Sequence, residues 1–268
     1  MPYAQVRTGI SLYYERIGQG PPLLLIMGTG LDHTCWQHQI SAYSPYFECI
    51  CFDNRGTGKS DAPVDDLTTK LLAEDAAGLL DALNVESAHV SGLSLGSCIA
   101  QELCLARPER VRSLQLHGTW GRAHGYAERK FKAQLRLLNA FSIADFYEIS
   151  MLWFITPQYF SVHPDRVTAQ IKAIVDAAPS MELLKAQYKA DLEHDALDRL
   201  PRIAVPTLVA VGSFDVALPP MYSREVAEAI PGSELVIIED GGHLFNLEIP
   251  EEFNRVTLGF LKRVSKLP

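Results

Sequence analysis

A serine with a glycine two positions to either side occurs in the run Gly92-Leu93-Ser94-Leu95-Gly96. The run follows a short apolar segment and precedes a helical pattern, so the serine would lie at a sharp turn between a strand and a helix. Such a turn strains the serine backbone and needs very small neighbours, because strand and helix approach closely. It would present the Ser94 hydroxyl above a sheet, beside backbone N–H groups at the start of the helix.

A serine hydroxyl becomes a good nucleophile only when a base removes its proton and an anion orients that base. His243 follows the last apolar segment of the chain, directly after two glycines, and Asp215 follows the apolar segment before it. Ser94 also follows such a segment, and open α/β sheets place their sites at the carboxyl ends of buried strands. We therefore predict that Ser94 is the nucleophile, His243 the base and Asp215 the orienting acid.

Other titratable side chains in the sequence have weaker claims to a catalytic role. Glu239 and Asp240 are close to His243 in sequence, but the predicted strand end would direct them elsewhere. His89 lies inside a predicted strand and His117 at the end of one, where packing or a hydrogen bond to backbone is expected. His33 follows a loop near the predicted sheet edge and is a candidate to border a pocket.

The elements that would position these residues alternate between strands and helices. Six nearly continuous apolar segments predict parallel strands buried on both faces, at residues 23–27, 47–52, 88–90, 111–116, 207–211 and 235–238. Two alternating segments predict an antiparallel hairpin before them, at 3–8 and 11–17. Apolar residues at helical spacing predict helices at 68–83, 95–106, 220–230 and 251–264. The alternation predicts an α/β fold around a mostly parallel sheet of about eight strands.

One stretch, residues 121–200, has no convincing strand but four helical patterns. The patterns are Phe131, Leu135 and Leu138; Phe146, Ile149 and Trp153; Val167, Ile171 and Ile174; and Met181, Leu184, Tyr188 and Leu192. Ser142 with Asp145 is typical of a capping box, and Ser180 of an N-cap. We predict a four-helix cap over 121–200, inserted into one core made of residues 1–120 and 201–268.

The predicted cap is rich in large apolar side chains. Met151, Trp153 and Phe154 would line an apolar pocket together with Gly28 and His33 of the core. Packing of the cap residues onto the edge of the sheet is the alternative, and the two interpretations overlap.

Composition excludes several classes of protein. The 268 residues are 47% hydrophobic and 21% charged, which is ordinary globular usage, so disordered and fibrous architectures are excluded. The net charge of −8 disfavours binding to nucleic acid or to an anionic membrane through a general basic field, although a local basic patch stays open. With no run of apolar residues long enough to span a membrane and no leader pattern, we expect a cytoplasmic protein.

The five cysteines do not suggest a disulfide framework or a metal site. Cys49 and Cys51 would point to the same face of one strand, as core residues do. The nearest approach to a ligand cluster is Asp32, His33 and Cys35, whose spacing does not match that of a metal site. We predict no metal.

The chain resembles the α/β hydrolases that carry a serine, a histidine and an aspartate with a helical cap, over essentially its whole length. The resemblance is carried by residues 92–96, by the turn 212–215 with Pro219 after it, by Gly242-His243 and by the run 53–60. Some relatives place the acid after the strand that ends near residue 116, but Gly118 and Thr119 stand there, which favours Asp215.

The resemblance also implies an oxyanion hole of two backbone N–H groups. One would belong to Leu95 and the other to the loop Met27-Gly28-Thr29-Gly30. We expect the second donor to be Thr29, with its hydroxyl as an auxiliary donor. Met27 stands where relatives usually have histidine, which puts substrate contacts inferred from those relatives in doubt.

The branches that the chain resembles most are enol-lactonases and small carboxylesterases. This implies cleavage of an ester or lactone with a mainly apolar or aromatic part, through an acyl-enzyme on Ser94 and without a cofactor. A serine at this turn argues against haloalkane dehalogenase and epoxide hydrolase chemistry, which use aspartate. The small-molecule substrate is the only partner predicted, and a homodimer stays open.

Three alternatives remain at this stage. A C–C bond hydrolase of ring-cleavage products would need an arginine in the pocket, for which Arg122, Arg129 and Arg136 are candidates. A ligand receptor that keeps the three residues, and a perhydrolase, are the others. Steady-state turnover separates enzymes from a receptor.

Overall fold

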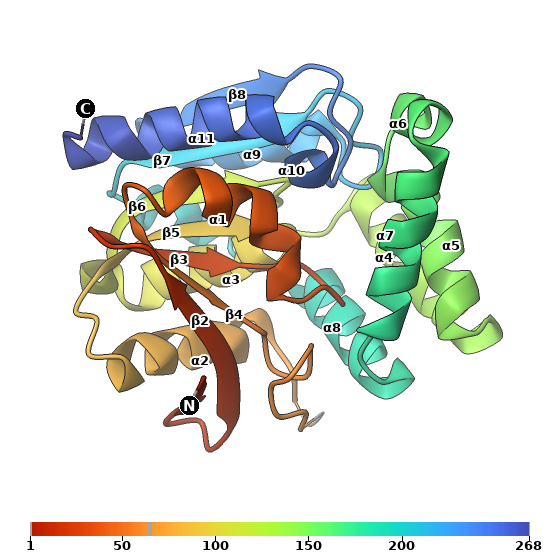
Figure 1. The fold of residues 1–268 in the computed structure, drawn as a ribbon, viewed down its shortest axis with the longest axis horizontal. Helices are drawn as coiled ribbons and strands as arrows, with labels where there is room; N and C mark the ends of the chain where they lie inside the picture. The colour runs from red at the N-terminus through yellow and green to blue at the C-terminus, as the bar shows by residue number, and fades with distance from the viewer. Residues whose placement is uncertain (1, 64–65, 268) are drawn as a thin grey trace.

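The computed structural model describes residues 2–63 and 66–267 and contains a sheet of eight strands (Figure 1). The strand order is β1-β2-β4-β3-β5-β6-β7-β8. The pairs β1–β2 and β2–β4 are antiparallel and the other five pairs are parallel, as predicted. The strands are β1 Tyr3–Gln5, β2 Ser11–Ile17, β3 Pro22–Ile26, β4 Glu48–Phe52, β5 Ala88–Leu93, β6 Val111–His117, β7 Thr207–Gly212 and β8 Glu234–Ile238.

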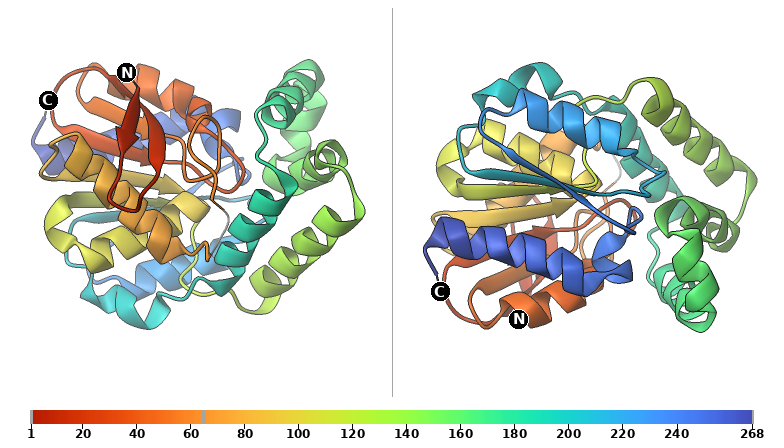
Figure 2. Two further views of the ribbon diagram at one scale, coloured as in Figure 1. Left: turned by 90° about the horizontal axis from the view of Figure 1, so that it is seen from below. Right: turned by 90° about the horizontal axis from the view of Figure 1, so that it is seen from above.

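Helices cover both faces of the sheet (Figure 2). On one face lie α1 Gln37–Tyr43 and α11 Pro250–Ser265; on the other lie α2 Thr69–Ala82, α3 Leu95–Ala106 and α9 Pro220–Ala229. Because every residue of β5 and β7 is buried between these layers, their apolar runs match the pattern of parallel strands. The shorter elements are η1 His33–Trp36, η2 Pro108–Arg110, η3 Leu197–Arg202 and α10 Phe245–Glu248.

The prediction missed the short helices α1, α10, η1, η2 and η3, and it made β1 too long. Strand β1 ends at Gln5 rather than at residue 8, because the chain turns at Gly9, whose φ is +86°. The sequence analysis predicted no helix at α1, which has only seven residues. Two of these seven residues are fully buried, so α1 is too short to show a helical stripe of apolar side chains.

Residues 121–200, the predicted cap, contain five α-helices rather than four: α4 Gly125–Ala140, α5 Ile143–Phe154, α6 Pro157–Val162, α7 Pro164–Asp176 and α8 Met181–Glu193. The additional helix, α6, is six residues long and shows no repeat of apolar positions. Both predicted N-caps are confirmed. The Ser142 hydroxyl accepts the Asp145 N–H at 3.1 Å, and the Ser180 hydroxyl accepts the Leu183 N–H at 3.3 Å.

The cap lies beyond one end of the sheet, where the parallel strands have their carboxyl ends (Figure 2). It leaves the core after β6 and returns before β7, two strands that are hydrogen-bonded to each other. Its ends are joined, because the Gly121 carbonyl accepts the Ala196 N–H at 2.8 Å and Arg122 forms a β-bridge with Asp195. Among the helices of the described residues, none is long and apolar enough to cross a bilayer.

Candidate active site

Ser94 lies between β5 and α3 in a strained conformation, with φ 55° and ψ −123°. A side chain on either flanking glycine would collide with backbone. A Cβ on Gly92 would lie 2.2 Å from the Gly96 carbonyl oxygen, and a Cβ on Gly96 would lie 2.1 Å from that of Ile26. Such backbone conformations cost about 1–3 kcal/mol and persist only where the surrounding structure imposes them. Because strained residues of this kind cluster at functional sites, Ser94 is a candidate functional residue.

His243 and Asp215 form a buried pair on neighbouring loops after β8 and β7. The His243 Nδ1 atom lies 2.7 Å from Asp215 Oδ2. The other carboxylate oxygen, Oδ1, accepts the Leu218 N–H at 2.7 Å, and both side chains are almost inaccessible to solvent. With both oxygens of Asp215 engaged, the carboxylate is fixed and orients the imidazole ring.

Ser94 and His243 line one cavity of about 330 Å³ between the core and the cap. The cavity is lined by Gly28, Thr29, Leu31, Leu93, Ser94, Lys130, Phe131, Phe154, Tyr188, Asp191, His243 and Leu244. The structure thus brings together the serine and the histidine that the sequence analysis paired, with Asp215 behind the histidine.

The loop after β3 approaches the serine closely. A Cβ on Gly28 would lie 3.0 Å from Ser94 Cβ and 3.6 Å from its Oγ. The Gly30 N–H donates to Gln187 Oε1 and the Leu31 N–H to the Gly28 carbonyl, so these two N–H groups are engaged within the protein. Thr29, which lines the cavity beside Ser94, is the candidate donor of this loop. The Leu95 N–H is the first of α3, where no acceptor exists within the helix. These two N–H groups are the candidates for an oxyanion hole.

Of the five predicted pocket residues, Gly28 and Phe154 line the cavity. The Phe154 ring lies over His243, with ring centroids 5.5 Å apart. Met151 and Trp153 do not line it: Met151 is fully buried in the hydrophobic core, and Trp153 is a partly buried residue at its edge. Met151 and Phe154 lie one turn apart on the buried side of α5, so the position along the helix, as well as its buried face, decides which side chain reaches the cavity.

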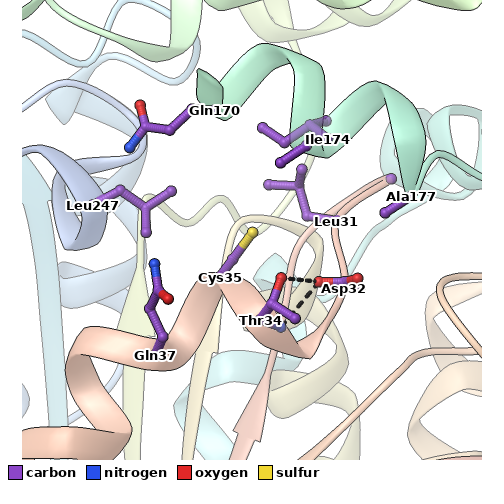
Figure 3. A pocket seen from close by; sticks show the side chains of 11 residues that line it. Leu31, Asp32, Thr34, Cys35, Gln37, Gln170, Ile174, Ala177 and Leu247 are labelled. Carbon is purple, nitrogen blue, oxygen red and sulfur yellow. Dashed lines mark hydrogen bonds between the residues drawn. The ribbon is translucent and has the colours of Figure 1, made fainter. Parts of the chain in front are cut away.

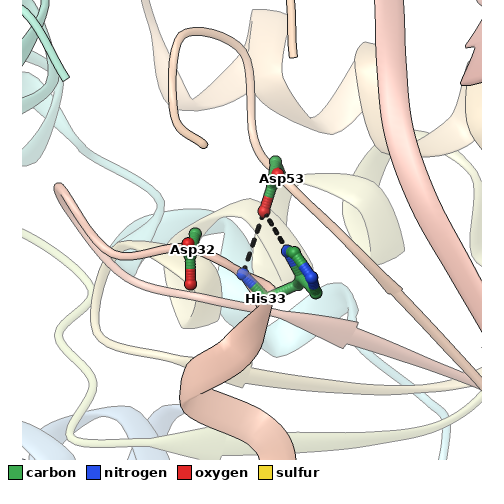
Figure 4. A group of neighbouring side chains, drawn as sticks. All are labelled: Asp32, His33 and Asp53. Atoms are coloured by element: carbon green, nitrogen blue, oxygen red, sulfur yellow. Dashed lines mark hydrogen bonds and ion pairs between the residues drawn. The ribbon is translucent and has the colours of Figure 1, made fainter. Parts of the chain in front are cut away.

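His33 does not line the cavity either, because the loop after β4 holds it (Figure 4). Its backbone N–H donates to Asp53 Oδ1 at 3.0 Å, and its Nδ1 lies 2.6 Å from the same oxygen. Asp53 Oδ2 accepts the Lys59 N–H at 2.9 Å. Asp32 completes a cluster with the spacing of metal ligands, whereas Cys35 lies outside it. The hydrogen bonds of Asp53 therefore fix the loop after β4 and join it to the segment of His33, which is a structural role.

The remaining alternatives lie away from the cavity. Glu239 and Asp240 are exposed at the end of β8. His117 is fully buried, and burial lowers its pKa to about 3. His89 is also buried, with its pKa lowered to about 4, and its Nδ1 lies 2.8 Å from the Ser113 hydroxyl. Both histidines serve packing within the sheet.

The cavity also contains two charged side chains that the sequence analysis missed, Lys130 of α4 and Asp191 of α8. Burial lowers the pKa of Lys130 and raises the pKa of Asp191. The Thr29 hydroxyl donates to Asp191 Oδ2 at 2.7 Å, so the auxiliary donor expected at Thr29 is engaged with the cap. Periodicity gives a signal for Lys130, since it shares a helical face with Ala127, Phe131 and Gln134.

The three arginines proposed for the pocket do not line this cavity. Arg129 and Arg136 are exposed, and Arg122 forms ion pairs with Asp195 and Asp198 at the surface. The cation that α4 directs inward is therefore Lys130, one residue after Arg129.

A second cavity, of about 530 Å³, lies between the loop around η1 and helix α7 (Figure 3). Gln170 and Ile174 face it from α7, Thr34 and Cys35 from the core, and Leu31 separates it from the cavity at Ser94 by lining both. Burial raises the pKa of the Cys35 thiol to about 12, so this cysteine is a packing residue rather than a nucleophile.

Glu248 of α10 ties the cap to the loop that carries His243. Its Oε2 accepts the Thr156 N–H at 2.9 Å and the Thr156 hydroxyl at 2.8 Å, and its Oε1 accepts the Gly242 N–H at 3.1 Å. The Leu244 N–H adds a hydrogen bond to the Phe154 carbonyl at 2.9 Å. Cap and histidine loop are therefore held together on both sides of His243.

Comparison with known proteins places this geometry in context. Residues 21–250 match the family model described as alpha/beta hydrolase fold. The "Putative carbamate hydrolase RutD" of Azorhizobium caulinodans is 34% identical over 99% of this chain and 100% of its own length. A thermophilic esterase from Thermogutta terrifontis is 30% identical with TM-score 0.87, covering 98% of both chains. The enol-lactonase from Burkholderia xenovorans LB400 is 27% identical with TM-score 0.88, covering 97% of this chain and 100% of its own.

Proposed function

The chain belongs to the alpha/beta hydrolase fold family, and from that premise we propose that it is a serine hydrolase of carboxylic esters or lactones that acts through an acyl-enzyme on Ser94. The observation that carries the proposal is the strained Ser94 facing the same cavity as His243, whose Nδ1 is held by Asp215. The esterase and the enol-lactonase among the similar structures support the same substrate class.

In the proposed mechanism each group acts on a stated atom. His243 removes the proton of Ser94 as the hydroxyl oxygen attacks the substrate carbonyl, and Asp215 keeps the imidazole proton on Nδ1 and stabilises the imidazolium. The N–H groups of Leu95 and Thr29 stabilise the oxyanion, a contribution of about 2.7–4 kcal/mol for one donor. The leaving alcohol takes the proton from His243, and a water molecule then cleaves the ester of Ser94 by the same route.

The walls of the cavity support a small substrate with an apolar part. The apolar surface comes from Leu31, Leu93, Phe131, Phe154 and Leu244, and such side chains commonly line the binding sites of small molecules. No arginine is among the described residues that line the cavity, which gives C–C bond hydrolysis of ring-cleavage products less support.

The proposal is tested by turnover of p-nitrophenyl butyrate with the wild type and a Ser94→Ala variant. We expect many turnovers per site in the wild type, as an enzyme but not a receptor would show, and a loss of at least about a thousand-fold in kcat for the variant. Ser161→Ala, an exposed serine of α6, is the matched control and should keep wild-type activity. Equal rates for the wild type and Ser94→Ala contradict the assignment of the nucleophile.

A further inference from the structure

Lys130 places a cation in the cavity without a fixed partner. Its side chain projects from α4 into the space shared with Ser94, and the residue is only 8% exposed. Within residues 2–63 and 66–267 its ammonium group makes neither a hydrogen bond nor a direct ion pair. Burying an ammonium group without hydrogen-bond partners costs free energy. A ligand that pairs with Lys130 would offset this cost.

The surroundings keep this ammonium charged but do not satisfy its hydrogen-bonding capacity. Its Nζ lies 4.5 Å from the ring centroid of Phe131, 5.4 Å from that of Phe154 and 6.0 Å from that of Tyr188. Rings at such distances stabilise a cation through their negative faces. The carboxylates of Asp191 and Asp215 also raise its pKa against the effect of burial. All three N–H bonds remain available to a ligand in the cavity.

Asp191 does not take up this capacity. Its Oδ2 accepts the Thr29 hydroxyl, and its Oδ1 is buried without a hydrogen-bond partner in the described part of the chain. A ligand with an anionic oxygen would accept a hydrogen bond from the Lys130 ammonium, which no group in the described part of the chain does.

We propose that Lys130 forms a carboxylate-binding subsite facing Ser94, so that the preferred substrate is a small ester or lactone that carries a carboxylate near its reacting carbonyl. This inference rests on the proposed function and narrows it. A mainly apolar substrate, as expected from the sequence, would leave the ammonium unpaired in the closed cavity. A carboxylate would exchange water for a charge-assisted hydrogen bond.

The test compares two esters of the same size and different charge, monoethyl succinate and ethyl 4-methylpentanoate, by ethanol release. We expect the wild type to favour the carboxylate ester by at least about ten-fold in kcat/KM. A charged hydrogen bond contributes about 1.5–3 kcal/mol, so Lys130→Met should lower this ratio by about ten- to one-hundred-fold. The ratio cancels any effect of the substitution that is common to both esters.

Lys132→Met is the matched control. Lys132 lies on the exposed face of the same helix, where it pairs with Glu128, and its substitution should leave both activities and their ratio unchanged. A wild-type preference for the neutral ester, or a ratio that Lys130→Met does not lower, overturns the subsite. The wild-type ratio requires no variant, so it decides the matter even if Lys130→Met does not fold.

Binding to Ser94→Ala separates the two proposals. If calorimetry shows that this variant binds monoethyl succinate more tightly than the neutral ester, and adding Lys130→Met removes the difference, the subsite stands even where no ester is turned over. If the wild type hydrolyses neutral esters and neither hydrolyses nor binds the carboxylate ester, the subsite fails and the serine hydrolase remains.

Discussion

Gly118 lies against the imidazole–carboxylate pair, where the chain leaves β6. Its φ is +52°, and a Cβ there would lie 3.1 Å from His243 Nδ1 and 3.3 Å from Asp215 Oδ2. Relatives of this fold use the same strand end as another place for the acid. Here the absence of a side chain allows His243 and Asp215 to meet, so the glycine and the acid after β7 depend on each other.

A Gly118→Ala substitution should therefore damage catalysis more than stability. The left-handed backbone costs alanine about 1–2 kcal/mol. The added methyl group would also displace the imidazole, and we expect kcat to fall by about one-hundred-fold, because small errors of position cost that much. Ester hydrolysis and urea denaturation measure the two effects.

Gly232→Ala is the control for the free-energy cost of placing alanine in a left-handed backbone conformation. Gly232 has a φ of +72°, and nothing lies within 4 Å of a Cβ built on it. This variant should lose a similar free energy of unfolding and keep its activity. If both variants lost activity to the same extent, contact with His243 would not be the cause.

Single residues could be predicted from the sequence where a motif fixes the backbone conformation. They could not be predicted where the role of a residue depends on which way its side chain points from a helix. Ser94 could be found because its turn requires glycines at both flanks. Lys130 was missed because it lies next to Arg129, and the choice between them depends on the phase of a helix within about 100°. The apolar residues Ala127 and Phe131 indicate which side of α4 is buried, and Lys130 lies on that side.

Glu248 joins helix α10 to the start of α6, because it accepts hydrogen bonds from Thr156 as well as from Gly242. A glutamate has two acceptor oxygens, whereas a glutamine has one and presents an amide N–H group in place of the other. In Glu248→Gln one of the buried N–H donors would therefore face another donor.

We expect Glu248→Gln to lose about 1–3 kcal/mol of unfolding free energy, the penalty for an unsatisfied buried group. Because Gly242 precedes His243, kcat/KM should also fall, by about ten-fold. Glu252→Gln, on the exposed face of α11, is the matched control. Thermal denaturation and ester kinetics would show the difference; wild-type behaviour of Glu248→Gln would mean that the cap is not held through this residue.

Elements of the core could be predicted more completely than those of the cap and its contacts. Buried parallel strands can be located from continuous apolar runs such as 207–211, and long helices from apolar residues that recur at helical spacing. Helix α6 has too few residues for a stripe, and contacts such as Glu248 to Thr156 join residues 92 positions apart, which no local pattern encodes.

For the whole molecule, the buried His117 makes stability depend on pH. Burial lowers its pKa to about 3, whereas the same group titrates near 6.5 when unfolded. The unfolded chain therefore binds this proton first as the pH falls. The stability that the neutral ring contributes is complete above about pH 6.5 and is lost as the pH falls towards 3.

Replacing this histidine removes its part of the pH dependence. In His117→Gln the slope of unfolding free energy against pH should decrease by about 1.4 kcal/mol per pH unit between pH 6 and 5. Denaturant titrations at several pH values measure it. The carboxyl groups of Asp191 and Glu248, whose raised pKa values act in the opposite direction, are common to both proteins and cancel. An unchanged slope would mean that His117 is protonated in the folded state; exposed His38→Gln is the control.

The fold class could be predicted for the whole molecule because the alternation of predicted strands and helices extends over most of the chain. The charged groups of the cavity could not be predicted in the same way, because the net charge of −8 is a sum over the whole chain and does not show that Lys130 and Asp191 are buried together.

The junction at Gly121 and Ala196 has a consequence for how such enzymes diversify. The Gly121 carbonyl accepts both the Ala196 and the Leu197 N–H, and the cap is inserted between the neighbouring strands β6 and β7. The core therefore has the same two chain connections whatever the length of the chain between them. Lengthening a loop costs little free energy once its ends are fixed. We expect that recombination at these two positions would exchange the cap of one such protein for that of another where the contacts of Thr156 with Glu248 and of Phe154 with Leu244 are kept.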